Sequence, residues 1–357
     1  MRPSRSGAVN SALPGKHTAV PNDHALPGGQ PADPPLRHVG LFYRGTEEYL
    51  ATVARFLLDG LAAAEYTFVA IAADKAAALR RVLGGHCARI TFADITELGR
   101  NPARIIPAIQ AFADRAGQPS APVRFVGEPV WPGRSAAELR EAARHEALLN
   151  LAFARANLAI LCPYAAVSLP AQVLADARCT HPLVTSDGRA GTSPEYAGPG
   201  VLPTGCQVPL PAPPGRTELV AYGKDLRGLR ALVARRAREA GLNADRTTDL
   251  VLAVSEVAAN TLVHTSAGGT ARLWLTAGEI VCEVRDTGTI ADPLAGCRKP
   301  DPDRPGGHGL WLVNQACDLA ELRSGPRGTV IRMHMKRGNA AASEPGHELP
   351  GGHLPLT

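Results

Sequence analysis

The chain has 357 residues, of which 45% are hydrophobic and 20% charged, and its formal net charge is +5. This length allows two domains with buried cores, so we expect a soluble two-domain protein. Part of the charge comes from Arg235, Arg236 and Arg238 on one expected helix. They lack the aromatic interleaving of a nucleic-acid surface, so direct nucleic-acid binding is not expected.

The two ends of the chain have the composition of disordered tails. Residues 1–35 and 338–357 are rich in Pro, Gly, Ala and Ser, without hydrophobic periodicity. Such segments bury too little apolar surface to fold, so both are predicted to be disordered. The chain lacks an apolar run of signal-peptide length at its start, and no later stretch approaches the roughly 18 apolar residues that span a bilayer. No membrane attachment is therefore expected.

Residues 36–198 alternate short apolar runs with longer amphipathic ones. Alternating strands and helices predict an α/β domain with a parallel sheet and helices on both faces. The expected strands are 38–43, 66–73, 89–95, 123–129 and 158–164. The expected helices are 47–64, 74–83, 103–116 and 135–154. Repeated prolines in residues 199–216 favour extended backbone and predict an interdomain linker.

Residues 217–337 predict a different α/β architecture, a sandwich with helices on one face of a mostly antiparallel sheet. Two alternating runs around Ala277-Gly278 indicate a β-hairpin. The other expected strands are 218–222, 319–324 and 328–335, and the expected helices are 225–242, 248–264 and 309–317. The loop 289–307 is rich in Pro, Gly and Asp, so we expect it to be mobile and to form a lid over a site.

Three separated groups of polar residues and glycines occur in this second domain. Glu256 and Asn260 are four residues apart inside an apolar helix, so they lie on one face and can reach one small object together. Asp286-Thr287-Gly288 ends a strand, and the segment 306–309, GGHG, opens the next helix. Each pattern alone is common, whereas this order and spacing together are much rarer. The alternative for the helix pair is a mutual hydrogen bond without a ligand.

These segments resemble the GHKL ATPase superfamily and, within it, the bacterial anti-sigma factor serine kinases, over about residues 218–336. SEVAANTLVH resembles the N box, VRDTG the G1 box and GGHGL the G2 box, and Gly328-Thr329 resembles the last nucleotide-contacting pair. The resemblance implies the Bergerat fold and a protein that binds ATP with Mg²⁺. It also implies control of a sigma factor, by sequestration or by serine/threonine phosphorylation of an antagonist protein, and it allows a homodimer.

The resemblance assigns a role to each site residue. Asn260 would offer its amide oxygen to Mg²⁺, which prefers oxygen ligands, and Glu256 would act as general base or orient the attacking hydroxyl. Asp286 would accept a hydrogen bond from the adenine amino group. Gly288 would let the backbone approach the base. Gly307 and Gly309 would present backbone N–H groups to phosphate at a helix N-terminus, and Thr329 would support the adenine end.

One residue departs from the family pattern. The G1 box is DxGxG, and Ile290 stands where the second glycine is expected. With this change we expect nucleotide binding to be kept and turnover to be weakened or absent. It also raises a non-catalytic alternative, a nucleotide-binding module that only sequesters a sigma factor.

The first domain resembles the MEDS sensory domain over about residues 36–198. The resemblance rests on HVGLFYRGTEEYL, GEPVWPGRSAAELREAARHEALLN and LAILCPY, and it implies signal input. The chain has no GxxxxGK[ST] phosphate loop. Open α/β sheets bind ligands at the carboxyl edge, so a small-molecule pocket and a structural role are both open for His38, Tyr43, Arg44, Glu128 and Trp131.

A sensor histidine kinase is a further alternative, with His145-Glu146 as its phosphoacceptor pair. This pair lies inside the first domain, and no coiled-coil hairpin precedes residue 218. We therefore expect His145 to be a structural surface residue. The seven cysteines are spaced singly, without CxxC, which predicts neither a zinc site nor a disulfide framework and favours a reducing cytoplasm.

Overall fold

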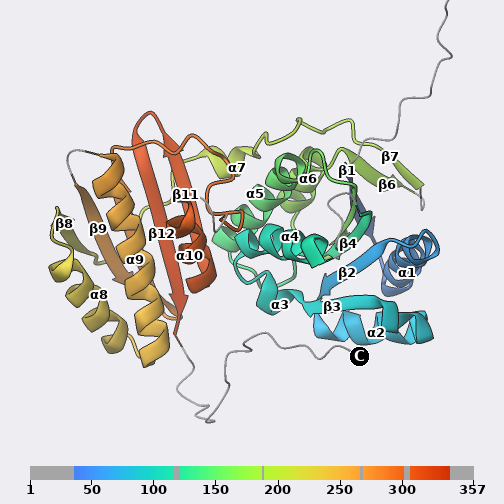
Figure 1. Ribbon diagram of the computed structural model, residues 1–357, viewed down its shortest axis with the longest axis horizontal. Coiled ribbons are helices and arrows are strands. Elements are labelled where there is room, and N and C mark those ends of the chain that lie inside the picture. Colours follow the sequence, from blue (N-terminus) through green and yellow to red (C-terminus); the bar gives the residue numbers. More distant parts are fainter. Residues whose placement is uncertain (1–35, 116–120, 187–188, 266–267, 301–305, 338–357) are drawn as a thin grey trace, which may run out of the picture. The chain divides into compact units, whose positions relative to one another are not determined.

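The computed structural model describes residues 36–115, 121–186, 189–265, 268–300 and 306–337. The tails predicted to be disordered, 1–35 and 338–357, lie outside these ranges. The described residues belong to one compact unit, and this unit contains two separate sheets (Figure 1).

The N-terminal sheet confirms the predicted α/β fold class. Its strand order is β3-β2-β4-β5-β1-β6-β7, in which β1 to β6 pair in parallel and β7 runs antiparallel to β6. The strands are β1 (Leu36–Tyr43), β2 (Tyr66–Ile71), β3 (Ile90–Asp94), β4 (Val123–Gly127), β5 (Leu158–Ala165), β6 (Leu183–Ser186) and β7 (Arg189–Thr192). The last two are too short to give a clear alternation and were not predicted.

Helices cover both faces of this sheet. One face packs against α1 (Thr46–Ala62) and α2 (Ala73–Leu83), and the other against α4 (Ile105–Arg115), α5 (Ala136–Ala152) and α6 (Ala171–Thr180). Short turns of helix complete the connections: η1 (Gly84–Arg89), α3 (Ile95–Leu98) and η2 (Pro102–Arg104). Helix α5 begins at a capping box in which the Ser135 hydroxyl and the Glu138 carboxylate each accept a backbone N–H.

The segment 199–216 is held by contacts along its length. It contains the short helix α7 (Thr204–Gln207), and Cys206 in this helix donates its thiol to the Arg140 carbonyl of α5, 3.1 Å away. Its carbonyls at Val208 and Pro211 accept hydrogen bonds from Arg323 and Arg332. The expected linker is therefore packed against both domains and is not a free connector.

The C-terminal sheet is antiparallel, with helices on one face, as predicted (Figure 1). Its order is β11-β12-β10-β9-β8. The strands are β8 (Glu218–Tyr222), β9 (Gly269–Leu275), β10 (Glu279–Asp286), β11 (Leu319–Gly325) and β12 (Gly328–Lys336). The helices are α8 (Arg227–Glu239), α9 (Ala244–His264) and α10 (His308–Ala316). Helix α9 starts earlier than predicted, because the Asn243 side chain caps it by accepting the Arg246 N–H.

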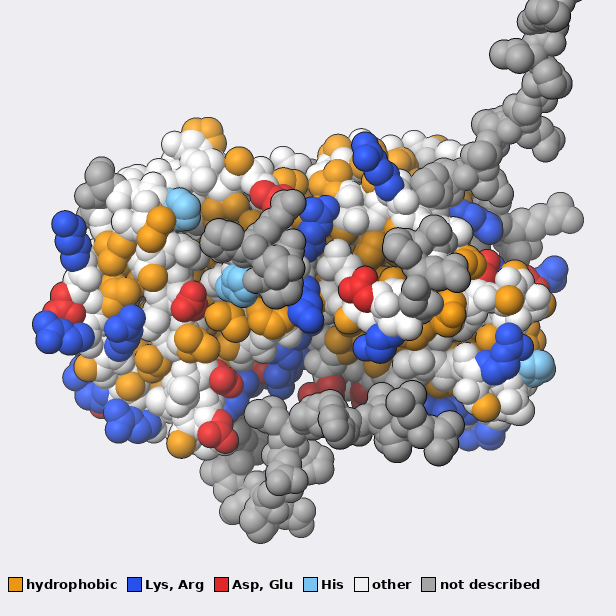
Figure 2. All heavy atoms as spheres, in the orientation of Figure 1, with side chains coloured by type: hydrophobic (Ala, Val, Ile, Leu, Met, Phe, Trp, Pro, Cys, Tyr) orange, Lys and Arg blue, Asp and Glu red, His pale blue; other side chains and the backbone are white. Residues whose placement is uncertain are grey.

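The arginines of α8 form a solvated face. Figure 2 shows basic side chains over this helix, at the left of the view, mixed with acidic ones. Arg236 pairs with Glu218 and Glu239 at 2.6 Å each, so its charge is neutralised within the chain. No helix in the described part of the chain has both the length and the apolar character needed to cross a membrane.

Candidate functional site

A cavity of about 680 Å³ opens in the C-terminal domain. Its walls come from α9, the end of β10, the first turn of α10, β12 and the segment 289–300. Six of the predicted site residues line it: Asn260, Asp286, Gly288, Gly307, Gly309 and Thr329. Its volume lies in the range of small-molecule sites, roughly 300–1,000 Å³.

Glu256 and Asn260 project from α9 toward the first turn of α10. A Cβ atom added at Gly309 would lie 3.0 Å from both Glu256 Oε2 and Asn260 Nδ2. A side chain at position 309 would therefore push on both groups, and glycine keeps the space in front of them open. Both residues are partly exposed, although their helix neighbours Val257 and Ala258 belong to the hydrophobic core.

Asp286 is held at the end of β10 by a chain of hydrogen bonds. The Tyr222 hydroxyl donates to Thr261 Oγ1 at 2.9 Å, and Thr261 donates to Asp286 Oδ2 at 2.7 Å. The Gly288 N–H donates to Asp286 Oδ1 at 2.8 Å. Each carboxylate oxygen thus has one partner and keeps lone pairs for a ligand. Sequence reasoning missed Tyr222 and Thr261; the only signal was a polar Thr directly after Asn260 in an apolar helix.

Thr329 stands opposite Asp286 on the neighbouring strand β12. Its hydroxyl lies 2.8 Å from the Gly288 carbonyl, to which it donates, and 2.8 Å from Ser324 Oγ. The preceding Gly328 has φ of +100°, and a Cβ there would lie 2.1 Å from the Asp286 carbonyl oxygen. Glycine is therefore required at 328 for the strand end that carries Asp286 to pack this closely.

Ile290 lines the cavity and packs against the C-terminal core. Its backbone N–H donates to Ser324 Oγ at 2.8 Å. Among the residues that the structure describes, Ala64 is the only non-glycine residue with a positive φ. The backbone at Ile290 therefore does not need glycine, and the departure from the G1 pattern leaves the loop intact.

The described part of the segment 289–307 differs from the mobile loop that we expected. Leu294 and Cys297 are buried and belong to the hydrophobic cluster of the N-terminal domain. The Gly296 carbonyl accepts a hydrogen bond from Asn314 Nδ2 of α10 at 2.9 Å. Composition indicated the absence of helix and strand, but it did not reveal these two apolar anchors. The rest of the expected lid, 301–305, lies outside the described residues.

Two basic residues at the cavity were missed. Arg298 and Lys299 are exposed and line it from this same segment. Their charge suits a polyanion, and the signal available in the sequence was an adjacent pair of cations between the G1 and G2 boxes. Together with the glycine-lined first turn of α10 and the Asn260 amide, the residues present fit a nucleotide with a magnesium ion.

The polar residues predicted at the edge of the N-terminal sheet do not form one site. Tyr43 donates to Glu128 Oε1 at 3.1 Å, and Lys75 joins both as an ion pair and hydrogen-bond donor. Arg44 is exposed and Trp131 stacks under the Arg134 guanidinium at 3.7 Å. His38 lies elsewhere, in the interior.

His145 is buried, so the expectation of a surface histidine was wrong. It is 4% exposed, because α5 packs against the N-terminal sheet on one side and meets the C-terminal domain on the other. Burial lowers the pKa of His145 to about 4. A neutral, buried imidazole is poorly suited to accept a phosphoryl group.

Two family models match the chain. One, described as "MEDS: MEthanogen/methylotroph, DcmR Sensory domain", matches residues 37–182, and one described as "Histidine kinase-like ATPase domain" matches residues 220–335. The chain carries both domains. The MEDS domain contains the N-terminal sheet, and the ATPase domain contains the C-terminal sheet with the cavity. The predicted limits of the domains, 36–198 and 217–337, stay predictions.

A solved structure also matches part of the chain. It is the crystal structure of the RsbU and RsbW domains of Rv1364c from Mycobacterium tuberculosis, with 20% sequence identity and a TM-score of 0.27. The match covers 35% of this chain and 34% of that one, so the chain spans about a third of the length of that protein chain. No curated protein matches the chain.

Proposed function

We propose that this protein is a cytoplasmic anti-sigma factor regulator that binds ATP with Mg²⁺ and phosphorylates a serine or threonine of an antagonist protein. The observation that carries the proposal is the convergence of the three predicted boxes on one cavity of about 680 Å³. The histidine kinase-like ATPase match and the resemblance to anti-sigma kinases support it.

The residues around the cavity divide the work. Bound magnesium ATP would supply the transferable phosphoryl group, and its metal ion would offset the negative charge of the phosphates. Asp286 accepts the adenine amino hydrogen, and Thr261 and Thr329 hold the carboxylate and the strand end in place. Asn260 offers its amide oxygen to the metal. Glu256 orients the attacking hydroxyl and takes its proton. Arg298 and Lys299 offer positive charge at the mouth of the cavity.

Helix α10 gives the MEDS domain a route to the phosphate end of the site. The buried Asn101 side chain donates to the Asn314 carbonyl and side chain at 3.1 Å. Arg104 donates to carbonyls at the other end of this helix, at 2.9 Å to Asn314 and 3.0 Å to Cys317, and to Gln315 as well. Cations at a helix C-terminus are favourable, and burial lowers the pKa of Arg104 only to about 10. The MEDS domain therefore caps the helix whose first turn faces Glu256.

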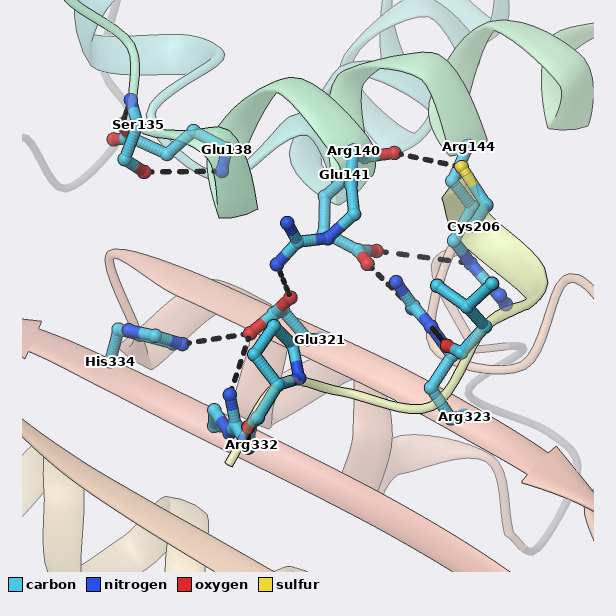
Figure 3. Close-up of polar contacts among 12 residues, drawn as sticks. Ser135, Glu138, Arg140, Glu141, Arg144, Cys206, Glu321, Arg323, Arg332 and His334 are labelled. Carbon is cyan, nitrogen blue, oxygen red and sulfur yellow. Dashed lines mark hydrogen bonds and ion pairs between the residues drawn. The ribbon is translucent and has the colours of Figure 1, made fainter. Parts of the chain in front are cut away.

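Helix α5 provides a second contact, through charged pairs with the ATPase sheet (Figure 3). Burial alone would raise the pKa of Glu321, but hydrogen bonds from His334 and Arg140 lower it to about 2. Burial alone would lower the pKa of His334, but hydrogen bonds to Glu279 and Glu321 raise it to about 9. The pairs that join α5 to the ATPase sheet are Arg140–Glu321 at 3.0 Å, Arg323–Glu141 at 2.8 Å and Lys336–Glu138 at 3.0 Å. A shift of α5 in response to a signal would leave buried charges unpaired, so the ATPase domain must follow.

The proposed function is tested by phosphate transfer. The full chain is purified with its bound proteins from the native host and supplied with Mg²⁺ and γ-labelled ATP. Label on a serine or threonine of a co-purifying protein is the expected result. Block of sigma-dependent transcription without any phosphate transfer would replace the kinase with the non-catalytic sequestration module, the alternative that Ile290 raises. Label on a histidine of the chain itself would support the histidine-kinase alternative.

Replacing Arg104 with glutamine should weaken nucleotide binding at a distance from the cavity. The variant removes donors from the end of α10, and couplings between sites are typically 1–3 kcal/mol, or about 5- to 150-fold in affinity. Calorimetry with Mg-ATP on the full chain measures the change. Arg115→Gln, at an exposed position of α4, is the matched control. Equal Mg-ATP affinity in wild type and Arg104→Gln would mean that the contact of Arg104 with the end of α10 does not couple the MEDS domain to the nucleotide site.

Bound nucleotide should slow tryptic cleavage after Arg298. This residue is exposed and lines the cavity, so a ligand held there covers the bond, while the next bond is protected by Pro300. Mass spectrometry of timed digests with and without Mg-ATP follows the product. Cleavage after the exposed Arg216, outside the cavity, serves as the internal standard. If Mg-ATP leaves the rate of cleavage after Arg298 unchanged relative to that after Arg216, the bound nucleotide does not cover this segment.

A further inference from the structure

A second group of chemically active side chains is buried in the MEDS domain. It consists of His38 from β1, Glu146 from α5, Cys162 from β5 and His181 directly after α6. Their ligand-type atoms all lie within 4.8 Å of one another. The four residues are at most 1% exposed, and the nucleotide cavity of the ATPase domain uses none of them.

The distances within this cluster suit a small cation. Glu146 Oε2 lies 3.0 Å from His38 Nε2 and 3.3 Å from His181 Nε2. Cys162 Sγ lies 3.4 Å from both His38 Nε2 and Glu146 Oε2. In a tetrahedral zinc site with bonds of about 2.0–2.3 Å, ligand atoms are roughly 3.3–3.7 Å apart. The observed spacings therefore need only small adjustments to surround an ion.

Both imidazole rings are oriented by their outer nitrogens. His38 Nδ1 lies 3.1 Å from Asn150 Oδ1, and the Asn150 amide is fixed because its Nδ2 donates to the Thr180 carbonyl at 2.8 Å. His181 Nδ1 lies 2.7 Å from the Ala177 carbonyl. With Nδ1–H donated to an oxygen, the Nε2 lone pair of each ring faces the cluster. Metal-binding histidines are held in this way.

The cluster contains more lone pairs than donors. His181 Nε2 and Glu146 Oε1 are buried and have no hydrogen-bond partner among the described residues. With its Nδ1–H donated to Asn150, His38 also places an Nε2 lone pair 3.0 Å from Glu146 Oε2. A buried carboxylate facing neutral lone pairs needs a positive centre.

The backbone leaves room for this arrangement. Strands β1 and β5 pair in parallel, with Gly40 next to Cys162 in the register, so His38 and Cys162 project on the same face of the sheet. A Cβ added at Gly40 would lie 3.2 Å from His181 Cγ. Glycine at this position therefore allows the His181 ring to reach over the strand.

We propose that His38, Glu146, Cys162 and His181 bind a zinc ion in a closed tetrahedral site. Two imidazoles, a thiolate and a carboxylate match the preference of zinc for nitrogen, sulfur and oxygen ligands. Binding replaces the thiol proton of Cys162, which leaves to solvent, with a sulfur–zinc bond. Four protein ligands leave no open position, so the ion is structural or regulatory. It ties β1, β5 and α6 to α5, the helix whose other residues contact the ATPase domain.

The test uses the full chain, stripped of metal by a chelator and titrated with Co²⁺ alone and then with Zn²⁺ alone. Cobalt should produce a thiolate-to-metal charge-transfer band and the visible bands of tetrahedral Co²⁺, saturating at one ion per chain. Zinc should displace it and raise the melting temperature. Cys162→Ser should lose the charge-transfer band and weaken binding by at least tenfold, and Gly40→Ala should weaken binding by displacing His181.

Cys179→Ser is the matched control, because this thiol lies on α6 and outside the cluster. Circular dichroism checks that each variant folds, and the zinc-dependent rise in melting temperature should persist in Cys179→Ser and vanish in Cys162→Ser. Wild-type protein that shows neither the band nor the rise would overturn the proposal and make the cluster a metal-free polar core. A band that persists in Cys162→Ser would also overturn it, because other thiols would then hold the ion.

Discussion

Asp286→Asn is expected to weaken the binding of Mg-ATP by about 5- to 150-fold, which corresponds to roughly 1–3 kcal/mol for an unsatisfied buried polar pair. The two carboxylate oxygens accept from Gly288 N–H and from the Thr261 hydroxyl. An amide keeps one acceptor and turns its NH₂ toward either a donor of the protein or the adenine amino group. Calorimetry on the full chain measures the loss.

Asp292→Asn is the matched control for this variant. Asp292 lines the same cavity and is exposed, and its Oδ1 accepts the Leu294 N–H at 2.9 Å, which an asparagine oxygen also does. The affinity of Asp292→Asn for ATP should stay near that of wild type. A nucleotide that lacks the adenine amino group should bind weakly to both wild type and Asp292→Asn. Equal ATP affinity in wild type and Asp286→Asn would remove Asp286 from the adenine site.

The fold could be predicted from the sequence wherever hydrophobic periodicity was long and regular. The strands β1 to β5 and the helix α9 follow from such patterns, because side chains on a buried face repeat at fixed spacing. Helix α5 was predicted as a helix, but its burial between the two domains was not. Its second buried face carries charged residues paired with the ATPase domain, so this face does not show the apolar stripe that would have indicated burial. The turn that holds Leu294 and Cys297 was read from its Pro and Gly content alone, and two apolar side chains were enough to anchor it.

The nucleotide cavity and the His38 cluster show opposite limits of sequence reasoning. Glu256, Asn260, Asp286 and Gly309 sit in short motifs, so the resemblance could predict that they meet. In the structure Asn260, Asp286 and Gly309 line one cavity, and Glu256 lies beside Gly309. The four residues of the cluster come from elements spread over 144 positions of the chain (38 to 181) and form no local spacing. Only the pairing of β1 with β5 and the packing of α5 and α6 over them bring these side chains together.

Glu256→Ala is expected to reduce phosphate transfer to the antagonist protein by about 10²- to 10⁴-fold, the usual contribution of a general base. ATP affinity should change little, because the base acts in the chemical step and Asp286, Asn260 and Gly309 remain in place. The measurement is the rate of single-turnover transfer of labelled phosphate at saturating Mg-ATP, alongside calorimetry on the same preparations.

Asp245→Ala serves as the control for this variant, since Asp245 is an exposed carboxylate in the first turn of the same helix. It should transfer phosphate at nearly the wild-type rate. Glu256→Gln separates two roles of the carboxylate: orientation of the hydroxyl survives in an amide of the same shape, whereas proton abstraction does not. A Gln variant as slow as the Ala variant indicates a base, and a Gln variant close to wild type indicates an orienting group. Transfer that is unchanged in both variants would mean that Glu256 takes no part in the chemical step.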